Sequence, residues 1–204
     1  QESQRRTVLL EERQRIVRDM HDGIGGQLLG LALQARGAGA DVGQIADGLE
    51  ASLLDLRLII DSMDTAESGL AESVMAFAHR IRPQVEAAGL VLELDNQLQP
   101  GDPVIGSRFT LQVMRVLQEA VANSLRHSGG RRLSLEARRS ADAVVLRVAD
   151  DGRGMSADAR TGRGMANMRA RLASLGGSLE VSDAKPGLVV GLVLPLTVLS
   201  APTA

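Results

Sequence analysis

Two stripes of apolar residues in the first third of the chain constrain the fold most strongly. Their members recur at steps of three and four, which places each stripe on one helical face, with Glu12 as an interruption of the first. A glycine-rich turn, RGAGADVG, separates them at 36–43. We therefore expect a helical hairpin over residues 1–66. The stripes consist of Val8, Ile16, Met20, Ile24, Leu28, Leu31 and Ala35, then Ile45, Leu49, Leu53, Leu56, Ile60 and Met63.

A single helical hairpin buries too little surface to be stable. Two hairpins packed as a four-helix bundle would bury both stripes. The sequence therefore predicts a homodimer held together by a four-helix bundle. The first helix begins in a polar segment without an obvious cap, and we expect it to continue from a region upstream.

The hydrophobic pattern changes after about residue 68, where segments with helical and strand periods begin to alternate. This mixture predicts an α+β fold, with a second domain over residues 67–204 built as an α/β sandwich. Helices are expected at 69–89, 107–128 and 164–177, and strands at 90–96, 131–140, 142–150, 178–183 and 188–196.

Composition excludes several classes of function. The chain has no cysteine, which removes disulfides, thiol catalysis and cysteine-ligated zinc. Its only lysine, Lys185, precedes a proline, so the Gly-Lys-Ser/Thr loop of a P-loop nucleotide site is absent. The net charge of −2 gives no strong field toward nucleic acid. No apolar run approaches the ~20 residues that span a bilayer.

Three segments of the second domain carry candidate chemistry. The segment VADDGRGM ends a strand, and its Asp150 could accept a hydrogen bond from an exocyclic amine such as that of adenine. Gly152 and Gly154 would let the backbone approach a ligand closely. In TGRGMANM, glycines open a helix, where free N–H groups suit phosphate. For each segment the alternative is an ordinary loop between elements.

The third segment, LQEAVANSLRHSGG, lies on the long helix. Glu119, Asn123 and either Arg126 or His127 are three or four residues apart and share a face. An asparagine oxygen suits Mg²⁺, and the basic residues suit phosphate. The alternative is a solvent-exposed polar stripe.

A fourth motif lies on the first helix, in RDMHDGIGGQ. His21 is followed at once by Asp22, and three glycines follow within four residues. A neutral imidazole is a good nucleophile near neutral pH, and an adjacent carboxylate can take its other ring proton. Each glycine weakens a helix by ~1 kcal/mol, so these glycines need another explanation. We interpret Gly23, Gly25 and Gly26 as positions where a larger side chain would obstruct docking beside His21 or where the helix must bend.

The four motifs, in this order and spacing, resemble a two-component sensor histidine kinase. The second domain resembles the Bergerat, or GHKL, ATP-binding fold, and the first resembles the subclass in which Asp directly follows the phosphorylated His. The resemblance covers nearly the whole chain. It implies that His21 is the phosphoacceptor, that Asp22 is its base, that Asn123 holds Mg²⁺ and that Glu119 is the acidic residue of the same helix.

The resemblance also assigns the nucleotide contacts. Arg126 and His127 match a basic residue and a histidine near the phosphates, and Asp150 matches the aspartate that reads adenine. The first and second glycine boxes are matched by Gly152, Gly154, Gly162, Gly164 and Met165.

Two positions depart from the family pattern. The subclass usually has Gln or His four residues after the Asp, where it assists dephosphorylation of the partner, but this chain has Gly26 there. Gln27 is turned by about 100° from that position and is no simple substitute. The family usually has Thr near the nucleotide where this chain has Leu188, which predicts weakened nucleotide binding.

We expect the chain to be the cytoplasmic core of a sensor histidine kinase that binds ATP and Mg²⁺, phosphorylates His21 within a dimer and passes the phosphoryl group to an Asp of a response regulator receiver domain. No direct nucleic-acid contact is expected. The parent protein is expected to have an N-terminal sensor that anchors it to a membrane. The alternatives are a degenerate dimeric adaptor that binds nucleotide without turnover and a GHKL kinase acting on serine, which would lack the His-Asp hairpin.

Overall fold

The computed structural model describes residues 25–26, 28–37, 41–43, 45–46, 48–49, 52–53, 56, 69–100, 103, 105–154 and 163–199. The chain divides into two compact units, residues 1–64 and 65–204. The domain boundary expected between residues 66 and 67 lies outside the described residues.

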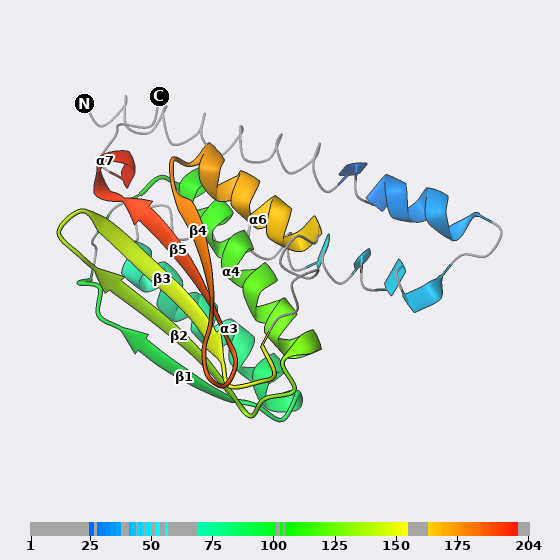
Figure 1. Ribbon diagram of the computed structural model, residues 1–204. Coiled ribbons are helices and arrows are strands. Elements are labelled where there is room, and N and C mark those ends of the chain that lie inside the picture. The colour runs from blue at the N-terminus through cyan, green and yellow to red at the C-terminus, as the bar shows by residue number, and fades with distance from the viewer. Residues whose placement is uncertain are drawn as a thin grey trace, which may run out of the picture. The chain divides into compact units, whose positions relative to one another are not determined.

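The second unit contains a five-stranded sheet whose strand order is β1-β2-β3-β5-β4. β1 is parallel to β2, and the other neighbouring pairs are antiparallel. Three helices cover one face of this sheet (Figure 1). The predicted α+β class is therefore confirmed. The strands are β1 (Val91–Asn96), β2 (Arg132–Arg139), β3 (Ala143–Asp150), β4 (Ser178–Asp183) and β5 (Leu188–Pro195).

The helices of this unit are α3 (Leu70–Ala87), α4 (Ser107–His127) and α6 (Arg163–Ser174). They agree with the helices expected from the apolar period to within two or three residues at each end. In α3 the apolar side chains recur every three or four residues and are buried. They are Leu70, Val74, Phe77, Ala78, Ile81 and Val85.

The strands bury alternate residues, because successive side chains point to opposite faces of a sheet. In β2 the buried positions are Leu133, Leu135 and Ala137. Val144, Leu146 and Val148 are their counterparts in β3. These side chains form the core against the three helices.

The end of the last strand differs from the expectation. The apolar run predicts a strand that includes residue 196, but β5 ends at Pro195 and a short helix, α7 (Leu196–Leu199), follows. The physical reason is that proline lacks the N–H that a sheet ladder needs.

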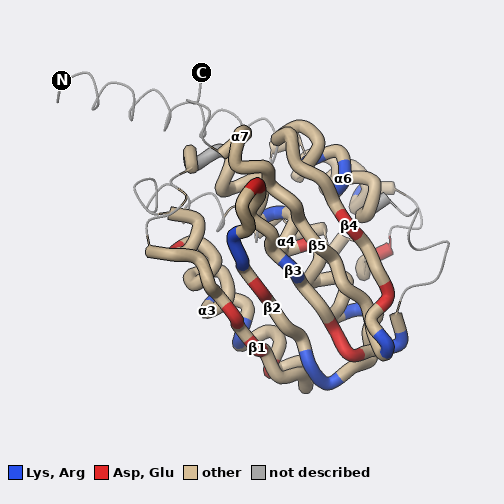
Figure 2. Tube along the Cα trace, turned by 60° about the vertical axis from the view of Figure 1, so that its left-hand side comes forward, with Lys and Arg blue, Asp and Glu red and all other residues tan. Residues whose placement is uncertain are grey.

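Charged residues recur along the strands (Figure 2), and in β2 and β3 several alternate with the buried residues, which places them on the face away from the helices. Arg138 of β2 contacts Asp95 of β1 at 2.9 Å, and Arg132 contacts Glu93 at 3.4 Å. These pairs are exposed, so they contribute little to stability. They also place charge along β1, which is one of the two edge strands, and charge on an edge discourages pairing with another strand.

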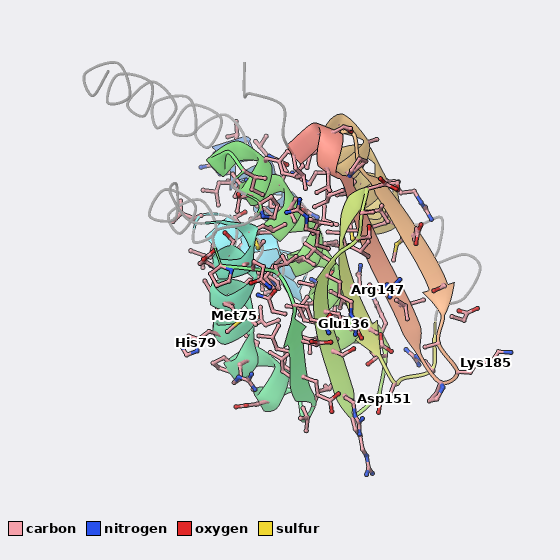
Figure 3. The ribbon with its side chains drawn as sticks, turned by 90° about the vertical axis from the view of Figure 1, so that its left-hand side faces the viewer. Met75, His79, Glu136, Arg147, Asp151 and Lys185 are labelled. Carbon is pink, nitrogen blue, oxygen red and sulfur yellow. The ribbon has the colours of Figure 1, made fainter. Side chains whose placement is uncertain are left out.

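On α3, Met75 and His79 project away from the sheet (Figure 3). Met75 is 51% exposed, and His79, which matches no motif of the sequence, is exposed as well. Neither lies with the residues expected to form a site.

The first unit is helical in its described part. Residues 28–35 are helical, Arg36 and Gly37 form a turn, and the described residues from 42 to 56 are again helical. The second helical stretch contacts the first at Gly48, where an added Cβ would overlap the side chain of Leu31. A small residue at this point allows the two helical stretches to approach closely.

Candidate functional site

Asp150 lies at the end of β3 and is only 6% exposed. Its Oδ2 accepts a hydrogen bond of 2.9 Å from the Ser124 hydroxyl on α4, and its Oδ1 accepts one of 3.0 Å from the Gly152 N–H. Burial of a carboxylate is costly unless such donors compensate for the lost water. Two of the roughly four lone-pair positions of a carboxylate are thereby used, and the others remain for a ligand.

Hydrogen bonds hold the loop that follows β3 on two sides. Asp151 Oδ1 accepts hydrogen bonds from the backbone N–H groups of Arg131 at 2.7 Å and Arg132 at 2.8 Å. These backbone donors, that of Arg132 first, hold the pKa of Asp151 below its ordinary value. On the other side, the N–H of Arg153 donates to the Ser128 carbonyl at 2.9 Å, which ties the loop to the end of α4.

A further contact joins the same loop to α4. The Nε of Arg153 donates to the His127 carbonyl oxygen at 2.7 Å. The Arg153 guanidinium is thereby held at the carboxyl end of α4, where the helix dipole favours a positive charge.

Two glycines of this region, Gly152 and Gly187, allow protein segments to pack closely. A Cβ on Gly152 would overlap the carbonyl of Ser128 at the end of α4. Gly187, in the turn before β5, has a φ of +105°, and a Cβ there would overlap the carbonyl oxygen of Asp150. The close approach of the end of α4 is thus one reason for glycine at position 152, and its contact with a ligand stays a prediction.

Glu119 and Asn123 lie on the α4 face that meets the start of α6. Both are half-buried, and a Cβ on Gly164 would lie 2.7 Å from Glu119 Oε1 and 3.8 Å from Asn123 Nδ2. The third sequence segment and the second glycine box are therefore neighbours in space. Since Ser124 follows Asn123 directly, the Asp150 carboxylate adjoins the same turn of α4.

Arg126 and His127 occupy the exposed last turn of α4. Met165 has a different environment, because its side chain is 2% exposed and belongs to the core. At the start of α6, the first N–H groups have no partner within the helix and can receive an anion. Glu119, Asn123, Asp150, Gly152, Gly154 and Gly164 thus come from three segments that adjoin one another.

Three predicted site residues lie outside the described residues: His21, Asp22 and Gly162. The segment 155–162, between the two glycine boxes, also lies outside them.

Sequence reasoning missed Ser124 and Asp151. Ser124 had a detectable signal, because it is a polar residue on the apolar face of α4, three and four residues after the buried Val121 and Ala120. A buried hydroxyl needs a partner, and this requirement could have directed attention to it. Asp151 had no comparable signal, since its partners are backbone N–H groups from another loop.

The described residues contain no group of three or more His, Cys, Asp or Glu side chains arranged to hold a metal ion. Mg²⁺ is commonly held by one or two protein oxygens together with phosphates, an arrangement that needs no such group. Within the described part of the chain, none of the helices has the length and apolar character required to cross a membrane.

Two family models match the chain. Residues 12–86 match the family described as "Histidine kinase", and residues 110–198 match "Histidine kinase-, DNA gyrase B-, and HSP90-like ATPase". His21 and Asp22 fall within the first range, and the predicted nucleotide contacts fall within the second.

Curated relatives are similar along most of this chain. Sensor histidine kinase MctS of Rhizobium johnstonii is 27% identical over 91% of this chain and 43% of its own length. Sensor histidine kinase DesK of Bacillus subtilis is 27% identical over 92% of this chain and 52% of its own length. The nitrate/nitrite sensor protein NarX of Escherichia coli is 28% identical over 92% and 33%, respectively. The chain spans about half the length, or less, of these relatives.

Solved structures share the fold. The blue-light activated histidine kinase of Erythrobacter litoralis EL346 matches with a TM-score of 0.66 at 18% identity, over 91% of this chain and 60% of that one. Histidine kinase AdeS of Acinetobacter baumannii matches with a TM-score of 0.54 at 19% identity, over 88% and 96%. With both family models in the expected order on the observed α+β architecture, the chain belongs to the histidine kinases and forms a histidine kinase core with a GHKL ATP-binding domain.

Proposed function

We propose that this core binds ATP with Mg²⁺, transfers the γ-phosphoryl group to His21 and then passes it to an aspartate of a response regulator receiver domain. The convergence of Asp150, the Glu119–Asn123 face of α4 and the start of α6 carries the proposal. A buried carboxylate can accept a hydrogen bond from the amine of a purine base. An amide oxygen suits a magnesium ion bound to a phosphate chain, and a helix N-terminus suits an anion.

At the base, Asp150 accepts a hydrogen bond from the exocyclic amine of adenine. Its carboxylate suits this role because it is an acceptor in an enclosed site, where an unmatched acceptor is costly. A nucleotide that presents a carbonyl oxygen in place of the amine would meet a negative charge and be rejected.

At the phosphates, Asn123 would supply an oxygen to Mg²⁺, and Arg126 and His127 would provide positive charge at the exposed end of α4. The metal, when bound, neutralises phosphate charge. Gly164 lies in the first turn of α6, whose free N–H groups face the phosphates, and Gly162 is proposed as a further member of the same glycine box. Glu119, beside Gly164, is the acidic residue assigned to the transfer step.

In the transfer itself, a ring nitrogen of His21 attacks the γ-phosphorus while the bond to the β-phosphate oxygen breaks, and ADP leaves. Asp22 accepts the proton from the other ring nitrogen and so favours the attacking tautomer. The same phosphoryl group then moves from His21 to a carboxylate oxygen of the receiver domain. The proposal covers these two transfers and not a phosphatase step, because Gly26 has no side chain with which to place water.

The proposed assembly is a homodimer formed through the first unit. Several apolar side chains on its described helical residues are exposed in the single chain. Burial of such surface is the main source of stability in helical bundles. We place this core in the cytoplasm, as part of a longer protein that an N-terminal sensor anchors to a membrane. No direct contact with nucleic acid is proposed.

The test is to incubate the chain with γ-labelled ATP and Mg²⁺ beside a His21→Gln variant. Label that survives base, is lost in acid and is abolished by His21→Gln supports the kinase. If wild type binds nucleotide but takes up no label, transfer by this core is contradicted and the adaptor alternative is favoured. An Asp22→Asn variant should label much more slowly than wild type.

A further inference from the structure

Asp150 receives its side-chain hydrogen bond from a helix and not from the sheet to which it belongs. Its register neighbours on the two adjacent strands are Leu133 of β2 and Leu188 of β5. Both leucines are buried, at 0% and 6% exposure. Aliphatic side chains offer no donor, so the strands beside Asp150 enclose its carboxylate without orienting it.

Ser124 supplies the missing donor from α4. Its side chain is 6% exposed, and its hydroxyl lies 2.9 Å from Asp150 Oδ2. Together with the Gly152 N–H at 3.0 Å from Oδ1, it engages both carboxylate oxygens. Two donors on different oxygens determine the plane of the carboxylate, and in an enclosed site such bonds are stronger than in water.

We infer that Ser124 is a positioning residue for nucleotide recognition: it orients the Asp150 carboxylate so that the remaining acceptor positions meet the exocyclic amine of the base. This inference rests on the proposed ATP site. It also assigns a purpose to the polar residue on the apolar face of α4. Neither Leu133 nor Leu188 can donate a hydrogen bond to the Asp150 carboxylate, so the hydroxyl on α4 provides that donor.

One consequence concerns the coupling between the two ends of the nucleotide. Ser124 directly follows Asn123, the proposed Mg²⁺ contact, on one turn of α4. A shift of this turn would therefore disturb base recognition and phosphate binding together.

The test compares two ligands that differ in one chemical group. ADP carries the 6-amino group, and purine riboside 5′-diphosphate lacks it. Dissociation constants of the full chain for both ligands, with Mg²⁺, are measured by titration calorimetry for wild type, Ser124→Ala, Ser124→Thr and Asp150→Asn. Ser73→Ala is the matched control, because Ser73 is also 6% exposed on a helix but donates to its own Gly69 carbonyl.

Ser124→Ala should raise the Kd for ADP about tenfold, the effect of weakening one hydrogen bond to a charged group. The Kd for the ligand without the amine should change less than twofold. Ser124→Thr keeps the hydroxyl and should restore ADP binding to near the wild-type Kd. Ser73→Ala should leave both constants unchanged.

Equal losses for the two ligands in Ser124→Ala would overturn the inference, because a merely structural defect affects both. An unchanged Kd for ADP would overturn it as well. The ratio of the two constants is independent of the fraction of variant that folds, since both ligands bind the same folded protein. If Asp150→Asn leaves the Kd for ADP unchanged, or wild type binds no ADP, the proposed nucleotide site is itself wrong.

Discussion

The two units of this chain use apolar residues differently. Six of the eight large hydrophobic side chains that are exposed among the described residues belong to the first unit, although far fewer of its residues are described. They are Leu28, Leu29, Leu33, Val42, Leu49 and Leu53. The second unit exposes Met75 and Val91 and buries most of its aliphatic residues beneath the helices.

The difference shows what each unit needs. A mixed sheet covered by helices closes a core within one chain. Two helices cannot enclose their apolar faces by themselves and need another surface. The second unit therefore encloses its own core, and the first is the unit through which we propose that the chain dimerises.

The largest expected effect is on assembly. Leu28→Glu with Leu53→Glu should convert a dimer into a monomer, because both side chains are on the predicted stripe and are 42% and 56% exposed in the single chain. Each leucine lost from an interface costs about 1.5–3 kcal/mol, and each buried carboxylate costs more. Light scattering measures the mass.

The matched control for assembly is Val91→Glu, because Val91 is 62% exposed on β1 of the second unit. It should leave the dimer intact. If the dimer persists in the double leucine variant but dissociates in Val91→Glu, dimerisation occurs through the second unit and the prediction is wrong.

The next effect compares one substitution in both units. Gly187→Ala should destabilise the second unit by roughly 2–4 kcal/mol, because φ is +105° and the new methyl group would overlap the Asp150 carbonyl. Gly26→Ala should stabilise the first unit by up to ~1 kcal/mol, because an added Cβ meets nothing within 4 Å on the helix. Urea unfolding measures both changes in the free energy of unfolding. If the two substitutions change it in the same direction, the contrast between the units is refuted.

The smallest effect concerns pH. Because backbone N–H groups lower the folded-state pKa of Asp151, its ionised form stabilises the second unit above the ordinary carboxyl pKa of 3.8, and this contribution is lost as the pH falls through the depressed folded value. Asp151→Asn should therefore unfold at slightly less urea at pH 7. The difference in urea midpoint between wild type and Asp151→Asn should become smaller below about pH 4.

Asp142→Asn is the control for the pH experiment, because Asp142 is an exposed aspartate in the turn between β2 and β3. Because this variant keeps Asp151, its urea midpoint should differ little from that of wild type at either pH 7 or pH 4. A wild-type advantage over Asp151→Asn that grows toward acid pH would contradict the assigned sign.

Much of the second unit could be predicted from local pattern. The alternation in 131–140 and the three-to-four spacing in 69–89 predict β2 and α3 because each element has one buried face. Asp150 and Asn123 can be identified as candidates because each belongs to a short motif of neighbouring residues in the sequence. Their neighbours Ser124 and Asp151 were not, because each acts through a partner at least 19 residues away.

The sequence by itself determined the order of the elements, the family and the residue types offered to a ligand, since these depend on periodicity and on short motifs. The tertiary structure alone decided which donor holds Asp150, why Gly152 and Gly187 must be glycine, and that Gly164 lies beside Glu119. Those facts arise where α4, the loop after β3 and the turn before β5 approach one another. Contacts between distant segments depend on packing in three dimensions, which no local period encodes.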